Sequence, residues 1–336
     1  MNKGFDFVLI IPPSPFLLDQ KRNPPLGVLY LAAALEREQV DFAIADLRGI
    51  REQDWLYHIP DAQSYGISAT SVEYPSAQKI ALGLGHRGRP VILGGVHASV
   101  FPTDKLFGFA SIVLGEAENA ITGIVEAAGN NHLQTAYACR RPVIDDLPIP
   151  ARHLLPLDSW ANDKLVRGHL STSILGSRGC PYKCSYCSEP AMFQRQVRFR
   201  DPRLVASEIA YLKMNYEITG FRFHDDLLTL KPSWLEELCE LLEPLGIAFR
   251  CNARVDTLTP EKCRWLKRAG CIDVGLGIES VYQPCLDLIQ KGQTVEQCDR
   301  AIQLLHDAGL QARVFLIVGL PGDVGDISGR SIEWLE

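Results

Sequence analysis

Short apolar runs separated by helical segments fill the first 130 residues, and this alternation is the strongest constraint on the fold. Residues 7–11 form an unbroken apolar run that ends at Pro12, which is typical of a parallel strand buried on both faces. Further strands are expected at residues 42–45, 64–68, 91–93 and 112–114, and helices at residues 26–38, 76–84 and 119–128. This order of elements predicts an α/β fold with a Rossmann-like, doubly wound parallel sheet and right-handed crossovers.

The residues that follow these strands are the candidate ligand contacts, because ligands of such sheets bind outside the carboxyl ends of the strands. They are Ser68, Thr70, Gly94, Gly95, His97, Gly115 and Glu116. Glycines let the backbone approach a large ligand closely, and hydroxyl groups supply hydrogen bonds. A tight turn alone also explains the two adjacent glycines. No Gly-x-Gly-x-x-Gly pattern follows the first strand, so the fingerprint of a nicotinamide dinucleotide site is absent.

The alternation lapses over residues 130–168, where four prolines occur, and this segment is predicted to be a linker or wrapping segment. It separates a first domain, residues 1–129, from a second domain, residues 169–336. In the second domain we expect strands at residues 171–175, 220–223, 248–251, 273–277 and 313–318, and helices at residues 202–216, 232–242, 260–269 and 294–308. A length of 336 residues favours two cores over one.

Three cysteines follow the first strand of the second domain, at positions Cys180, Cys184 and Cys187. Thiolates at these spacings can converge from one loop on three irons of a cubane [4Fe–4S] cluster, which leaves one iron open to a small-molecule ligand. A zinc site that borrows a distant fourth ligand is the alternative. The six later cysteines show no tight pairing and are expected to pack as buried small hydrophobic residues.

The run from Gly176 to Cys187 resembles the radical S-adenosylmethionine (radical SAM) superfamily, whose signature is Cys-x3-Cys-x2-Cys with an aromatic residue, here Tyr186, before the last cysteine. The resemblance implies a partial (β/α) barrel and a SAM molecule that chelates the open iron through its amino and carboxylate groups. One electron from the reduced cluster, supplied by a donor such as flavodoxin or ferredoxin, then cleaves SAM to methionine and a 5′-deoxyadenosyl radical. The cofactors carry out the difficult chemistry, and the protein orients and insulates them.

The same resemblance implies SAM contacts at the ends of the later strands. With Tyr186, they are Asp225, Asp226, Arg254, Glu279, Ser280 and Gly319. The adjacent aspartates would accept from the SAM amino group, although one of them alternatively caps a turn. The arginine suits the SAM carboxylate, with a salt bridge inside the barrel as the alternative. The Glu-Ser pair resembles the ribose-contacting motif of the superfamily, and the glycine opens a Gly-Leu-Pro-Gly turn near the nucleoside.

The first domain resembles that of the cobalamin-binding class of radical SAM enzymes. The resemblance rests on residues 24–32, 65–68, 93–98 and 115–118. It implies that the strand-end residues from Ser68 to Glu116 contact cobalamin. The Asp-x-His-x-x-Gly motif, whose histidine ligates cobalt in domains of the methionine-synthase type, does not occur here. We therefore expect cobalamin to bind without a lower histidine ligand.

The combined resemblance implies a cobalamin-dependent radical SAM methyltransferase that acts on an unactivated carbon, or on phosphorus, of a small-molecule or natural-product substrate. One SAM would methylate cobalamin, and another would yield the radical that abstracts hydrogen from the substrate. A rearrangement or cyclisation without methyl transfer is one alternative, and a non-catalytic cobalamin or Fe–S sensor is another. A methylthiotransferase fits less well, because its first domain would carry three further cysteines and only Cys139 precedes Cys180.

The composition of the chain limits the kinds of binding partner and the cellular compartment that are expected. Lys and Arg number 34 against 40 Asp and Glu, and the net charge of −6 argues against a dedicated nucleic-acid binder. No apolar run approaches the ~18–20 residues that a membrane span needs, and the first residues do not resemble a secretory signal. Nine of the ten cysteines lie at or after Cys180, which indicates metal binding in a reducing compartment. A cytoplasmic protein is expected.

The second domain is expected to have only five strands, whereas barrels of the superfamily generally have six βα units. The fifth strand would then have an unpaired edge, and part of the barrel interior would be open to water. We therefore expect a C-terminal extension or another chain to complete the catalyst.

Overall fold

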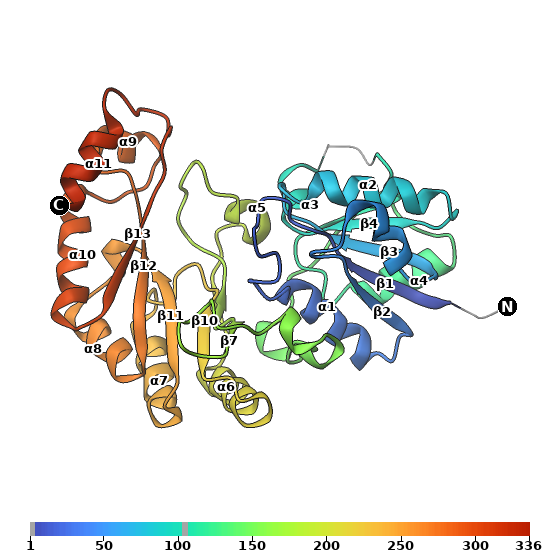
Figure 1. The fold of residues 1–336 in the computed structure, drawn as a ribbon, viewed down its shortest axis with the longest axis horizontal. Helices are drawn as coiled ribbons and strands as arrows, with labels where there is room; N and C mark the ends of the chain where they lie inside the picture. Colours follow the sequence, from blue (N-terminus) through green and yellow to red (C-terminus); the bar gives the residue numbers. More distant parts are fainter. Residues whose placement is uncertain (1–3, 103–106) are drawn as a thin grey trace. The chain divides into compact units, whose positions relative to one another are not determined.

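Two compact units make up the structure, a computed structural model that describes residues 4–102 and 107–336 (Figure 1). The first unit ends at Ala161, and the second unit spans Asn162–Glu336. Each unit is built around its own parallel sheet.

The first unit contains a six-stranded sheet in the order β2-β1-β3-β4-β5-β6, in which every neighbouring pair is parallel. The strands are β1 (Phe5–Ile11), β2 (Phe42–Asp46), β3 (Ala62–Ser68), β4 (Val91–Gly94), β5 (Ser111–Leu114) and β6 (Ala136–Ala138). The predicted doubly wound α/β fold is confirmed. The strand order reverses between β1 and β3, which is the topological switch point where sheets of this type bind ligands.

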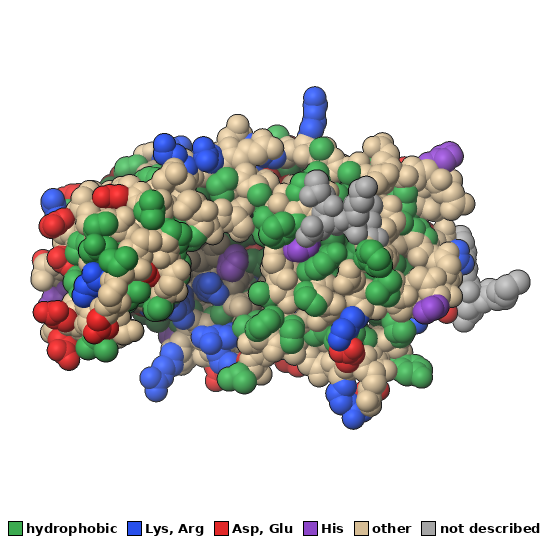
Figure 2. Space-filling view, turned by 90° about the horizontal axis from the view of Figure 1, so that it is seen from above, with side chains coloured by type: hydrophobic (Ala, Val, Ile, Leu, Met, Phe, Trp, Pro, Cys, Tyr) green, Lys and Arg blue, Asp and Glu red, His purple; other side chains and the backbone are tan. Residues whose placement is uncertain are grey.

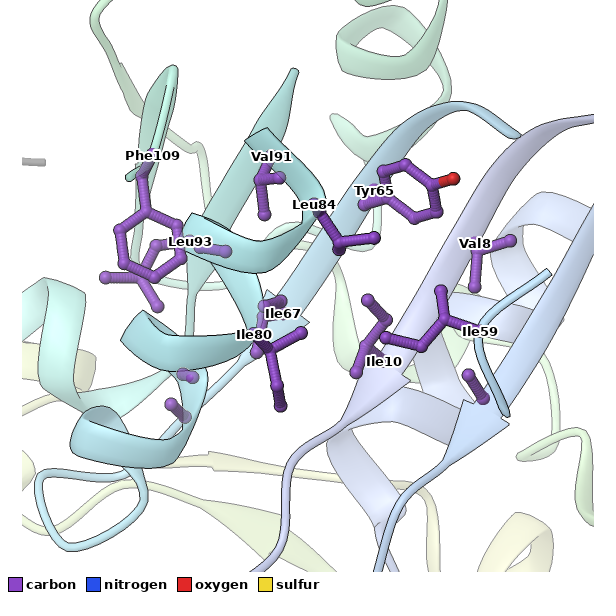
Figure 3. Packing of buried hydrophobic residues seen from close by; sticks show 14 of the residues in the cluster. Val8, Ile10, Ile59, Tyr65, Ile67, Ile80, Leu84, Val91, Leu93 and Phe109 are labelled. Atoms are coloured by element: carbon purple, nitrogen blue, oxygen red, sulfur yellow. The ribbon is translucent and has the colours of Figure 1, made fainter. Parts of the chain in front are cut away.

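Helices pack their apolar sides on this sheet and bury its core. They are α1 (Leu26–Arg37), α2 (Tyr74–Gly85), α3 (Val96–Val100) and α4 (Ile121–Gly129). Figure 3 shows Ile80 and Leu84 of α2 facing Ile67, Val91 and neighbouring side chains of the strands. Removal of this apolar surface from water is the main stabilising contribution to the unit.

The segment that the sequence predicts to be a linker contributes β6, at the edge of the first sheet. β6 has only three residues, two of which are alanine, so it is too short to show the alternation of a strand in the sequence. Further along, the segment wraps over α1, because Ala151 N donates to Leu29 O (3.1 Å) and Arg37 Nη1 donates to Asp146 O (3.3 Å). Most of the segment therefore belongs to the first unit.

The second unit contains a five-stranded parallel sheet in the order β13-β12-β11-β10-β7. The strands are β7 (Ser171–Ile174), β10 (Gly220–Phe223), β11 (Ala248–Ala253), β12 (Cys271–Glu279) and β13 (Gln311–Leu316). The helices are α5 (Glu189–Phe193), α6 (Pro202–Tyr216), α7 (Pro232–Leu242), α8 (Pro260–Arg268), α9 (Gln283–Leu288), α10 (Val295–Asp307) and α11 (Ile327–Leu335). The predicted partial (β/α) barrel is confirmed. Among the described residues β13 is an edge strand, as the sequence predicts for the fifth strand.

Local signals fix where the long helices of the second unit begin. The first turns of α6, α7 and α8 each contain a proline, namely Pro202, Pro232 and Pro260. A proline is tolerated there because the first-turn N–H groups have no partner within the helix. Before α10, Thr294 and Gln297 form a capping box, in which each side chain accepts from the backbone of the other.

The two faces of the second sheet differ in character. Helices cover one face (Figure 1), on which Phe221, Phe223 and Phe249 are fully buried. The rings of Phe223 and Phe249 pack edge-to-face, with centroids 5.3 Å apart. Because side chains alternate along a strand, Arg222 of β10 and Arg250 of β11 belong to the opposite, inner face.

The cysteines outside the three-cysteine motif of the second unit are buried, as predicted. They are Cys239, Cys251, Cys263, Cys271, Cys285 and Cys298. Desolvation raises the pKa values of Cys263 and Cys298 to about 11, so these thiols are protonated at neutral pH and pack as small apolar groups.

Within residues 4–102 and 107–336, no helix is long and apolar enough to cross a membrane. On the face drawn in Figure 2, basic and acidic side chains both occur, with apolar side chains between them. This mixture agrees with the small net charge of −6.

Candidate cluster and cofactor sites

The three-cysteine motif lies in a loop closed by a small antiparallel pair. β8 (Ser177–Arg178) precedes the loop and β9 (Arg198–Phe199) follows it, and the two strands pair with each other. Gly179 begins the loop with φ of +93°, and a Cβ atom there would collide with the carbonyl oxygen of Gln196. Glycine is therefore required immediately before Cys180.

The three motif thiols lie near one another at the surface of the loop. Cys180 and Cys184 are half-buried, and Cys187 is exposed. The pKa of Cys180 is raised to about 11, mainly by desolvation and then by the negative charges of Asp226, Cys187 and Cys184. Three neighbouring thiolates therefore need positive irons to hold them together.

The donor set fits a cluster better than a single ion. Among the described residues, no three His, Cys, Asp or Glu side chains lie close enough to share one metal ion. In a cubane cluster each thiolate binds a different iron, so the three sulfurs need not meet at a point. Three cysteines from one loop are the ligand set that a [4Fe–4S] cluster with one open iron requires.

Arg254, which the resemblance assigns to the SAM carboxylate, is held among protein partners. Its buried guanidinium pairs with Asp256 (Nε to Oδ1, 2.9 Å) and donates to Lys291 O (2.8 Å). It also stacks on the ring of Tyr182 (3.6 Å), and Nη1 donates to the Sγ atom of Cys184 (3.8 Å). Arg254 therefore forms a salt bridge with Asp256, which was the alternative to a SAM contact, and it also connects the end of β11 to the cluster loop. Its contact with SAM stays a prediction.

The two aspartates after β10 have different surroundings. Asp225 is buried and accepts from Gly176 N (3.0 Å) and Ser177 Oγ (2.6 Å), so it holds the turn between β7 and β8. Desolvation raises the pKa of Asp225 to about 7, although these two hydrogen bonds oppose the shift. Asp226 neighbours Glu189, a residue that the sequence did not single out, and desolvation raises the pKa values of both carboxyls.

Glu279 forms a buried ion pair with Lys291, which the sequence did not reveal. Glu279 Oε1 lies 2.8 Å from Lys291 Nζ, and the two side chains are 9% and 6% exposed. Lys291 also donates to the hydroxyl of Tyr186 (3.0 Å), which links the end of β12 to the cluster loop. Glu279 has a φ of +68°, a left-handed conformation that is uncommon outside glycine and is concentrated at functional sites.

A pocket opens at the carboxyl ends of β12 and β13. Its lining includes Glu279, Ser280, Tyr282, Ile317, Val318 and Arg330. In the Gly-Leu-Pro-Gly turn that follows, Gly319 N and Leu320 N both donate to Asp323 Oδ2 at 2.9 Å. Asp323 is a second residue that the sequence did not single out. A mostly apolar pocket with a carboxylate and a hydroxyl group in its wall fits a nucleoside.

The candidate cobalamin residues gather at the carboxyl edge of the first sheet. Ser68 and Gly94 are register partners at the ends of β3 and β4. Gly95 has a φ of +91°, and a Cβ atom there would lie 2.9 Å from Ser68 Oγ, so the tight turn requires glycine. Gly115 N donates to Ser99 Oγ (2.9 Å) in α3. This edge offers backbone and hydroxyl groups to a large ligand, which fits cobalamin.

The remaining candidates at this edge differ in exposure. Thr70 is exposed, and both its backbone N and its Oγ1 donate to Glu73 (2.9 Å each). Glu116 is buried. Their contacts with cobalamin stay predictions.

His97 is packed among aromatic side chains. Its ring centroid lies 3.9 Å from that of Tyr74 and 5.2 Å from that of Phe101. Its Nδ1 atom is hydrogen-bonded to Ser71 Oγ (3.1 Å), and the residue is only 6% exposed. A ring held in this way supports the expectation that cobalamin binds here without a lower histidine ligand.

Two family models match the chain. The Radical SAM superfamily model matches residues 174–327, and the B12 binding domain model matches residues 20–125. The chain therefore contains a radical SAM domain, preceded by a B12-binding domain. The predicted [4Fe–4S] cluster, SAM and cobalamin are the cofactors of these two domains.

Relatives of known name include methyltransferases and a cyclase. An uncharacterized methyltransferase of Pyrococcus horikoshii is 29% identical over 96% of this chain and 75% of its own length. Bacteriochlorophyllide d C-8(2)-methyltransferase of Chlorobaculum tepidum is 31% identical over 76% of this chain, and the anaerobic magnesium-protoporphyrin IX monomethyl ester cyclase of Rubrivivax gelatinosus is 40% identical over 90%. This chain spans 59% and 60% of the lengths of the latter two proteins.

Solved structures agree on the fold. The radical SAM methyltransferase TsrM from Kitasatospora setae, with cobalamin and a [4Fe–4S] cluster bound, superposes with a TM-score of 0.78 at 17% identity over 98% of this chain and 70% of its own. The cobalamin-dependent radical enzyme OxsB gives a TM-score of 0.76 at 18% identity over 98% of this chain and 52% of its own.

Replacement of Cys180, Cys184 and Cys187 by alanine should abolish the cluster. After anaerobic reconstitution, iron analysis should fall from about four irons per chain to about none, because the loop loses every thiolate ligand. A matched Cys298→Ala variant, which removes a buried thiol outside the loop, should keep its iron. About four irons in the triple variant would show that other residues ligate the cluster.

Lys291→Met should strongly destabilise the second unit, because it leaves the Glu279 carboxylate buried without its partner. We expect the free energy of unfolding, measured by urea denaturation and circular dichroism, to fall by about 3–5 kcal/mol. The double variant with Glu279→Gln should lose less, since it removes both charges. A loss below about 1 kcal/mol in the single variant would show that water solvates the pair.

His97→Ala should leave the cobalt coordination of bound cobalamin unchanged. In the electron paramagnetic resonance spectrum of the cob(II)alamin form, we expect no nitrogen superhyperfine coupling from a protein histidine in either protein, because the ring is packed between Tyr74 and Phe101. Coupling that disappears in the variant would instead identify His97 as a cobalt ligand.

Proposed function

We propose that the protein is a cobalamin-dependent radical SAM methyltransferase that acts on an unactivated carbon, or on phosphorus, of a small-molecule or natural-product substrate. The observation that carries this proposal is the presence in one chain of a three-cysteine cluster loop and a B12-binding edge. When bound, the cluster and SAM supply a radical that removes hydrogen from the substrate, and cobalamin supplies the methyl group. Two of the relatives described above are named methyltransferases.

The residues of the chain hold and orient these groups. The three motif cysteines would ligate the cluster, and Arg254 would donate to the sulfur of Cys184 beside it. Lys291 fixes the Glu279 carboxylate at the wall of the pocket, where it would accept from ribose hydroxyls. Asp323 accepts hydrogen bonds from the backbone N–H groups of Gly319 and Leu320 and so holds the turn that borders the pocket.

A radical cyclisation without methyl transfer is the second candidate. It is favoured by the 40% identity to a protein named as a cyclase. Both candidates share the hydrogen-abstraction step and the same cluster loop. A sensor function is disfavoured. The pocket at the ends of β12 and β13 is held by a buried ion pair and a fixed turn, and a sensor would have little use for a site built to hold the nucleoside of SAM.

The proposal includes two further elements. The cluster needs an electron donor, such as flavodoxin or ferredoxin, and we infer that the protein works in the cytoplasm, where thiols stay reduced.

Methyl-labelled SAM distinguishes the two candidates. Reconstituted protein with cobalamin, a reductant and a metabolite extract should transfer label to one small molecule, and Cys184→Ala, which removes a cluster ligand, should abolish the transfer. The extract is fractionated and the labelled product identified by mass spectrometry. Formation of 5′-deoxyadenosine together with an unlabelled product that has lost two hydrogens would instead favour cyclisation.

A further inference from the structure

A buried cation lies beside one of the cysteines of the cluster loop. Arg254 directly follows β11, and its Nη1 atom donates to the Sγ atom of Cys184 at 3.8 Å. The two residues are 70 positions apart in the sequence, and the arginine is only 4% exposed. A charge that is buried in this way is weakly screened by water and salt. It therefore acts strongly on any change of charge at the sulfur.

The other partners of the guanidinium fix its orientation. Nε and Nη2 pair with the two carboxylate oxygens of Asp256, at 2.9 and 3.1 Å. Nη2 also donates to Lys291 O (2.8 Å), and the guanidinium stacks on the ring of Tyr182 at 3.6 Å. A bidentate pair of this kind fixes the plane of the guanidinium. Nη1 is not part of the pair, and it is the group that reaches Cys184.

These contacts favour a role at the cluster over the role that the resemblance implies. The edge formed by Nε and Nη2 is the fork with which arginine binds a carboxylate through two parallel hydrogen bonds. Asp256 occupies this edge. The carboxylate of SAM would have to displace Asp256 or compete with Cys184 for Nη1. The fork of Arg254 is therefore used within the chain.

The turn after β11 holds this ion pair in place. The backbone N and the Oγ1 atom of Thr257 both donate to Arg254 O, at 3.1 and 2.8 Å. The buried Lys262 braces the turn, because its Nζ atom donates to Thr257 O (2.6 Å) and Thr229 O (2.8 Å). The turn places Asp256, two residues after the arginine, against the guanidinium. A group held in advance needs little reorganisation when a charge appears beside it.

We propose that Arg254 raises the reduction potential of the [4Fe–4S] cluster through its hydrogen bond to Cys184. Reduction transfers one electron from the external donor to the cluster, so it adds one negative charge there without breaking a bond or moving a proton. A cationic donor at a ligand sulfur stabilises the reduced state. Asp256, on the edge away from Nη1, offsets part of this effect. The proposal rests on the proposed function in one respect, namely that Cys184 ligates the cluster.

The potential of the cluster is measurable without a substrate. Reconstituted full-length chain, without SAM and cobalamin, is titrated with a reductant, and the reduced cluster is followed by electron paramagnetic resonance. Arg254→Met should lower the equilibrium constant for one-electron reduction at least about threefold, a shift of about 28 mV to lower potential. Asp256→Asn, which keeps an acceptor but removes the negative charge, should shift the potential upward. Arg203→Gln, which changes an exposed arginine on α6, should leave it unchanged.

Shifts of opposite sign distinguish a charge effect from a loosened loop, which would move both variants in the same direction. An unchanged potential in Arg254→Met, or a fall in both variants, would overturn the proposal. Weaker binding of SAM to Arg254→Met in calorimetry, with an unchanged potential in the absence of SAM, would overturn it too and would assign the arginine to the SAM carboxylate.

Iron content shows whether each variant holds its cluster. If Arg254→Met does not retain about four irons, Asp256→Asn decides alone: a higher potential supports the proposal, and an unchanged or lower one overturns it. The expected shifts without methyl transfer would contradict only the proposed function. Methyl transfer with unchanged potentials would contradict only the role of Arg254.

Discussion

Every strand of the two large sheets runs parallel to its neighbours, and this constraint determines where the chemistry of the protein lies. Parallel strands need crossover connections, so the carboxyl ends of all the strands meet at one edge of each sheet. In the first unit that edge brings together Ser68 and Gly94, from different strands. In the second unit it brings Arg254 and Glu279 to the cluster loop. Arg254 donates to the sulfur of Cys184, and Lys291 links Glu279 to the hydroxyl of Tyr186. Rigid strands thus position residues that lie far apart in the sequence.

Charged side chains are tolerated on the inner face of the second sheet because glycines leave room for their partners. On β12 the inner-face positions are Asp273, Gly275, Gly277 and Glu279, so a charged residue stands at each end of a glycine pair. A Cβ atom at Gly277 would lie 2.9 Å from the Nζ atom of Lys291, and Gly275 admits the guanidinium from β13 in the same way. A buried charge without a partner is strongly unfavourable, so space for the partner is as important as the charge itself.

The sequence predicted the strands and long helices well, because apolar runs and first-turn prolines are local signals. It also located the cluster loop, since all three thiols lie in one short segment. It missed β6, which is only three residues long. It missed the partner of Glu279 as well, because Lys291 lies twelve residues away beyond α9 and nothing in the local pattern marks the contact. The tertiary contact of Arg254 with Cys184 spans 70 residues, and only the folded chain shows it.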